Sequence, residues 1–141
     1  LYGEQRVEDT WRDYPLLLSS FIDDEGEKGA NPGLLTTIDR RKFDADAKVI
    51  QTHRPYTTVM RDLASTLDVP LIDTNTFSRG WLTKLGEQAS KSYFLYLPPE
   101  VNPNYPDGVA DDTHLNEKGA QVIAEFVAKE LKSLPAPYSD F

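Results

Sequence analysis

The residues best suited to carry chemistry lie in the stretch Asp111-Asp112-Thr113-His114. His114 is one of two histidines among the 141 residues. A single turn can bring the carboxylate of Asp111 onto the imidazole, where it accepts from Nδ1–H and leaves Nε2 free to take a proton. Asp112 is less suited, because the side chain next to Asp111 is expected to point away from His114. The pattern therefore predicts the acid and base of a Ser-His-Asp triad. Solvated loop acids ahead of a helix are the alternative interpretation.

The elements on either side must position this stretch. Asn116 is a suitable N-cap, and the helix that begins there is expected to bury the apolar residues that follow at helical spacing, from Ala120 to Leu131. Residues 98–108 precede the stretch and are rich in proline, which predicts a stiff surface loop. We therefore expect Asp111 and His114 between a loop and the start of a helix.

Upstream, expected helices and strands alternate. Apolar periodicity predicts helices over residues 15–28 and 55–67, and another helix that begins near Thr74 or Asn75. Short apolar runs bounded by turn formers predict buried strands over residues 32–38 and 69–73. Residues 1–13 are expected to form a loop or an approach to a helix, and the segment from Asp39 to Arg54 is expected to be irregular. Short connections between such elements indicate an α/β layer with a parallel sheet.

Composition excludes several classes of function. The 23 acidic residues outnumber the 15 lysines and arginines, so no basic face is available for nucleic acid. The absence of cysteine excludes disulfides and thiolate chemistry. No apolar run reaches the roughly 18 residues that indicate a membrane-spanning helix.

Several phrases occur in the order found in one family. They are Leu35-Thr36-Thr37-Ile38-Asp39-Arg40-Arg41-Lys42-Phe43, Thr52-His53-Arg54-Pro55-Tyr56, Val69-Pro70-Leu71-Ile72-Asp73, and Pro103-Asn104-Tyr105-Pro106-Asp107-Gly108 leading into Asp111-Asp112-Thr113-His114 and Lys118-Gly119-Ala120. Residues 11–131 thereby resemble the C-terminal half of SGNH/GDSL-type serine esterases, in particular the rhamnogalacturonan acetylesterase group.

The resemblance implies a flavodoxin-like three-layer α/β fold with a parallel sheet, the SGNH hydrolase fold. Residues 1–134 would supply only its C-terminal part, and residues 135–141 a loosely held tail. It also implies removal of acetyl groups from a pectin-type polysaccharide or oligosaccharide through an acyl-serine intermediate, without a cofactor. Asp111 and His114 occupy the positions of the catalytic acid and base. An extracellular or periplasmic location is suggested by the resemblance alone.

The sequence departs from the family pattern at the nucleophile. The family carries its serine in a Gly-Asp-Ser phrase, but none of the eight glycines of this chain has a serine at the next two positions. No Gly-x-Asn-Asp phrase for the oxyanion donors is present either. Two parallel strands also need more cover than these helices supply. We therefore expect a missing N-terminal half, a second chain or a swapped copy to complete the sheet and the site.

Four further side chains are candidates for contact with the substrate. Arg40 and Arg41 follow a predicted strand at its carboxyl end, and a guanidinium suits the carboxylate of a uronate sugar. Tyr105, in the proline-rich loop, is a candidate to stack on a sugar face, and His53 is a candidate to line the substrate-binding cleft or to bind a proton. Ordinary surface charge, core packing and a structural histidine are the respective alternatives.

A function of another class stays open. Without a nucleophile, the chain is also interpretable as a non-catalytic carbohydrate-binding or truncated remnant of an esterase. A metal site that uses His53 and His114 has little support, because the two histidines are not paired at the spacing of metal ligands.

Overall fold

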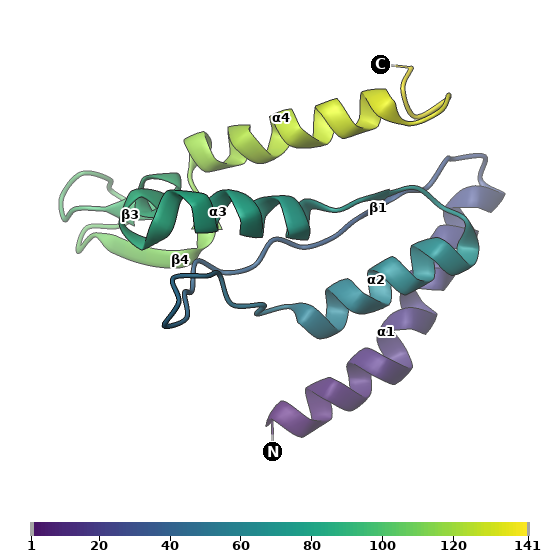
Figure 1. Ribbon diagram of the computed structural model, residues 1–141, viewed down its shortest axis with the longest axis horizontal. Coiled ribbons are helices and arrows are strands. Elements are labelled where there is room, and N and C mark those ends of the chain that lie inside the picture. The colour runs from purple at the N-terminus through teal and green to yellow at the C-terminus, as the bar shows by residue number, and fades with distance from the viewer. Residues whose placement is uncertain (1, 141) are drawn as a thin grey trace. The chain divides into compact units, whose positions relative to one another are not determined.

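A computed structural model describes residues 2–140 of the chain, and the side chains of residues 12–140 (Figure 1). The chain divides into two compact units. The first contains the residues up to Thr37, His53–Asn75 and the residues from Val127 onward. The second contains Ile38–Thr52 and Thr76–Phe126.

Two helices form most of the first unit. Helix α1 (Tyr2–Glu27) packs beside α2 (Arg54–Leu67), as Figure 1 shows. Ile22 lies in one buried cluster with Met60 and Ala64, so these helices share a small apolar core. The predicted helix over residues 55–67 is confirmed.

The irregular segment predicted for residues 1–13 is wrong over its described part, because α1 already begins at Tyr2. This segment contains helix-forming residues such as Glu4, Gln5 and Arg6 but no apolar period, so periodicity alone does not indicate a helix. Pro15 consequently lies inside the helix and not in its first turn.

The two predicted strands pair with each other but are short. Strand β1 (Leu34–Leu35) runs parallel to β2 (Leu71–Ile72). At the carboxyl end of β1, the buried Thr36 donates its hydroxyl to Asp73 Oδ1 at 2.8 Å and accepts from the Asn75 backbone N–H at 2.8 Å. Side-chain bonding thus replaces further strand pairing at this point.

The described part of the predicted tail is attached to the first unit. Tyr138 is half-buried and donates its hydroxyl to the Pro32 carbonyl at 3.0 Å. The tail therefore contacts the first unit through at least this side chain.

An antiparallel pair forms the centre of the second unit. Helix α3 (Thr74–Ser90) and a 3₁₀ turn, η1 (Lys91–Tyr93), lead into β3 (Phe94–Leu97), which pairs with β4 (Val109–Leu115). Val49, Leu82 and Phe94 are almost fully buried in one cluster. The sequence predicted no strand over residues 109–115, because the polar run at its centre lacks the alternation of a half-buried strand.

The loop between β3 and β4 is closed by its own backbone. Glu100 N–H donates to the Pro106 carbonyl at 2.9 Å, and Tyr105 N–H donates to the Asn102 carbonyl at 2.9 Å. Gly108 ends the loop with φ 78°, and a Cβ at this position would lie 2.6 Å from the Leu97 carbonyl oxygen. The loop predicted between these residues is confirmed, and its stiffness stays a prediction.

Asn116 joins the start of helix α4 (Glu117–Ser133) to β3. Its Oδ1 accepts from the Gly119 N–H at 3.1 Å, as predicted for an N-cap, and its Nδ2 donates to the Phe94 carbonyl at 3.0 Å. Gly119 packs against the chain before β3, where a Cβ would lie 2.1 Å from the Tyr93 carbonyl oxygen. The helix therefore begins at a fixed place behind the strand.

The apolar side of α4 is less buried than the sequence predicted. Ala120 is exposed, and Val122, Ile123 and Phe126 are half-buried. Over the described residues, the fold is mixed α/β with one parallel pair and one antiparallel pair of strands. None of the described helices is both long enough and apolar enough to cross a membrane.

Candidate active site

The chemistry-bearing stretch lies in an irregularity of strand β4. Tyr96 pairs with Ala110 and Phe94 pairs with Leu115, so two steps along β3 face five steps along β4. The surplus falls within residues 111–114, which leave the ladder as a bulge. Bulges re-aim side chains and are common beside active sites. The polar residues of β4 thus point where a regular strand would not send them.

The predicted contact between acid and base is present in this bulge. Asp111 Oδ2 lies 2.6 Å from His114 Nδ1. The other carboxylate oxygen, Oδ1, accepts from the backbone N–H groups of Thr113 at 2.6 Å and His114 at 3.0 Å. One side chain therefore both closes the turn and orients the imidazole, as the three-residue spacing predicts.

Three donors keep Asp111 ionised. Its pKa is lowered to about 2, first by the hydrogen bond to His114 and then by the backbone N–H groups of Thr113 and His114. The His114 side chain is 73 % exposed. Among the described residues, no serine is hydrogen-bonded to it. The arrangement supplies an anchored imidazole whose outer nitrogen can accept a proton from an incoming group.

Asp112 has partners of its own. Arg41 donates its backbone N–H to the Asp112 carbonyl at 2.8 Å and its Nε to Asp112 Oδ1 at 2.5 Å. Tyr96 also donates its hydroxyl to the same carboxylate oxygen. The remaining guanidinium nitrogens of Arg41 donate to the Glu87 carbonyl at 2.7 Å and the Tyr96 hydroxyl at 3.1 Å.

Of the predicted substrate-binding residues, the structure brings Arg41 to the bulge but in a different setting. The Arg41 side chain is only 4 % exposed, so its guanidinium faces protein groups. Burial works to lower the pKa of Arg41, but the hydrogen bonds to Asp112 and Tyr96 outweigh it and raise the pKa, so the group stays cationic. This placement does not favour the predicted contact with a uronate.

The other three candidates lie in different settings. Arg40 is exposed, and Tyr105 is 38 % exposed in the loop that precedes β4. His53 is half-buried immediately before α2 and belongs to the first unit, whereas Asp111 and His114 belong to the second. Their roles as substrate contacts stay predictions.

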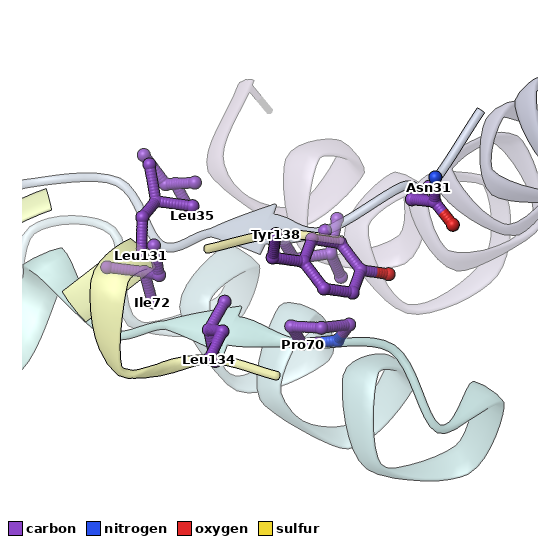
Figure 2. Close-up of a pocket in the computed structure, with 9 residues that line it drawn as sticks. Asn31, Leu35, Pro70, Ile72, Leu131, Leu134 and Tyr138 are labelled. Carbon is purple, nitrogen blue, oxygen red and sulfur yellow. The ribbon is translucent and has the colours of Figure 1, made fainter. Parts of the chain in front are cut away.

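A pocket in the first unit is lined by other residues than the candidate catalytic ones. It is lined chiefly by apolar side chains, and Figure 2 shows Tyr138, Leu134 and Pro70 around it. Neither Asp111 nor His114 lines it. No group of His, Asp or Glu residues able to hold a metal ion occurs in the described part of the chain.

Two residues of this site are not indicated by the sequence. The sequence predicts only that the Asp112 side chain points away from His114. It does not indicate the partner, which is Arg41 in the structure. Tyr96 belongs to a short apolar stretch in the sequence. Its hydroxyl partner lies 16 positions away, so no local pattern indicates the contact.

Comparison with known proteins identifies relatives. The chain is 39 % identical over 123 residues to the rhamnogalacturonan acetylesterase RhgT of Bacillus subtilis (strain 168), covering 87 % of this chain and 53 % of that protein. It is 29 % identical over 136 residues to the probable rhamnogalacturonan acetylesterase YesY of the same organism, covering 96 % of this chain and 58 % of that protein. No family model matches, and no solved structure matches. The chain is therefore a relative of the rhamnogalacturonan acetylesterases, as the resemblance indicated, and it spans about half the length of the curated relatives it matches.

Proposed function

We propose that this chain supplies the base and the acid of a serine carbohydrate esterase that removes acetyl groups from a pectin-type polysaccharide. The observation that carries the proposal is the 2.6 Å contact between His114 Nδ1 and Asp111 Oδ2 beside an imidazole that is 73 % exposed. The names of the two relatives support the substrate class. The nucleophilic serine and the oxyanion donors would be supplied from outside this stretch of 141 residues.

The proposed reaction uses His114 twice. Its Nε2 removes the proton from the serine hydroxyl as the oxygen attacks the acetyl carbonyl, and then protonates the departing sugar oxygen. An acetyl-serine remains, which water hydrolyses with His114 again acting as the base. Asp111 holds the Nδ1–H tautomer and stabilises the imidazolium that forms in each step.

Replacement of the base tests this proposal. In the full-length protein, His114→Ala is expected to lower kcat on an acetylated rhamnogalacturonan oligosaccharide by about 10²–10⁴-fold, because the general base is lost. Asp111→Asn is expected to lower kcat as well, since the imidazole loses its anionic partner. Asp107→Asn, an exposed acid in the preceding loop, is the matched control. Near-full turnover by His114→Ala would reject the proposal and leave the carbohydrate-binding alternative.

We also propose that Arg40 contacts a uronate carboxylate of the polymer. Arg40 is exposed, unlike Arg41, and a guanidinium binds carboxylates through paired donors. Arg40→Ala is expected to raise KM for the acidic polysaccharide and to leave turnover of a neutral ester such as p-nitrophenyl acetate unchanged. Equal losses on both substrates would remove the uronate contact.

A further inference from the structure

The bulge of β4 needs support that the β-ladder does not provide. Residues 111–114 lie between the last regular pairs of β3 and β4, so their backbone groups have no cross-strand partners in register. The bond from Thr113 N–H to Asp111 Oδ1 closes the turn from within. The direction in which the bulge projects must be fixed by something outside it.

Arg41 contacts the bulge at a single residue, by two independent routes. Its backbone N–H binds the Asp112 carbonyl, and its Nε binds the Asp112 carboxylate. Asp112 lies directly after the acid and two positions before the base. A displacement of Asp112 would therefore move Asp111 and His114 relative to each other.

The guanidinium that holds Asp112 is itself fixed. It donates to the Glu87 carbonyl at 2.7 Å, near the end of α3, and to the Tyr96 hydroxyl at 3.1 Å on β3. Its carbon atom lies 5.5 Å from the centre of the Tyr96 ring. A side chain that is 4 % exposed and bonded to three segments is restricted in its movement. Arg41 thus ties the bulge to α3 and β3.

We propose that Arg41, with Tyr96, is a positioning residue of the esterase: it holds Asp112 and thereby keeps Asp111 aligned on His114. This inference rests on the proposed function, because it assigns the arginine a role through the proposed acid and base. It replaces the expectation that Arg41 binds a sugar carboxylate.

Kinetics of the full-length protein separate positioning from substrate contact. Arg41→Met keeps the length of the side chain and removes its charge and donors. We expect kcat to fall by about 10–100-fold, the scale of a misplacement near 1 Å, with KM within about twofold of the wild-type value. Arg41→Lys should recover part of the loss, because an ammonium can restore only some of the bonds. Lys42→Ala, an exposed neighbour, is the matched control.

A spectroscopic measurement and a double variant report on the alignment itself. The proton in the short His114 Nδ1–H···Asp111 bond should resonate far downfield in the wild type and in Lys42→Ala, and shift or broaden in Arg41→Met. Combining Arg41→Met with Asp111→Asn should lower kcat little more than Asp111→Asn alone, because both changes disturb one unit. If Arg41 only stabilised the fold, the fall in kcat caused by Arg41→Met would add to the fall caused by Asp111→Asn.

Several outcomes would overturn the inference. They are a folded Arg41→Met variant with wild-type kcat and resonance, a change confined to KM, and full additivity with Asp111→Asn. Should Arg41→Met fail to fold, Tyr96→Phe and Asp112→Asn take its place, and unchanged kcat in both would overturn it. Full activity of His114→Ala would instead refute the proposed function, so the two failures are distinguishable.

Discussion

The parallel pair β1–β2 joins two residues on each strand, whereas the antiparallel pair β3–β4 joins a strand of four residues to one of seven. Around β3, Leu82 and Phe94 are 1 % and 0 % exposed. In the other unit, Leu35 on β1 is 45 % exposed, and Phe21 on α1 is 65 % exposed. The parallel pair does bury Leu34 and Ile72, which are 7 % and 3 % exposed, but it leaves the next residue of β1 open, as expected of parallel strands that depend on cover from distant segments.

The same contrast applies to the polar groups. Inside the second unit, Asp111 is bonded by Thr113 and His114. Asp112 is bonded by Arg41 and Tyr96. No serine takes part in these contacts of Asp111 and Asp112. The contact between the proposed base and acid is therefore formed by local structure, within four consecutive residues.

The largest effect on stability is expected in the buried cluster of the second unit. Leu82→Ala should lower the free energy of unfolding by about 2–5 kcal/mol, because a 1 % exposed leucine leaves a cavity. Denaturant unfolding of the full-length protein measures the loss. Leu16→Ala, at a position 68 % exposed on α1, is the control. A loss below about 0.5 kcal/mol for Leu82→Ala would mean that this core is not close-packed.

Leu35 tests whether the parallel pair is covered in the full-length protein. If further strands or helices pack on β1 as proposed, Leu35→Ala should cost about 1.5–3 kcal/mol, the value of a fully buried leucine side chain. The 45 % exposure of Leu35 in this chain corresponds to a much smaller loss. A measured cost below about 0.5 kcal/mol would mean that the Leu35 side of β1 is not covered in the full-length protein, and would contradict the proposed completion of the sheet.

The smallest expected effect is the pH dependence contributed by Asp111. Its pKa is lowered from 3.8 to about 2, so its contribution to stability is present above pH 3.8 and is lost as the pH falls toward 2. The stability difference between the wild type and Asp111→Asn should therefore shrink over this range. Solvent near the exposed His114 keeps the effect small. A difference that does not change between pH 5 and pH 2 would contradict the native contact.

The sequence predicted α2, the presence of two parallel strands at β1 and β2, and the contact between Asp111 and His114, because each depends on the pattern of residues along a short segment. It overestimated the length of both parallel strands, since hydrophobic runs do not say where pairing stops. It missed β4, because the central residues of this strand are polar and lack the alternation of a half-buried strand. The bonds of Arg41 to Asp112 join residues 71 positions apart, and no single-sequence pattern reports such a contact.

Gly119 adds a structural requirement to the short Asp-x-x-His pattern, so the two together identify similar sites in other sequences more specifically. A side chain at this position would place its Cβ 2.1 Å from the Tyr93 carbonyl oxygen, so a helix can begin this close behind β3 only with glycine there. The glycine follows His114 by five positions, with the capping Asn116 between them. A sequence that carries the acid, the base, the cap and the glycine at these intervals specifies the backbone geometry as well as the reactive groups.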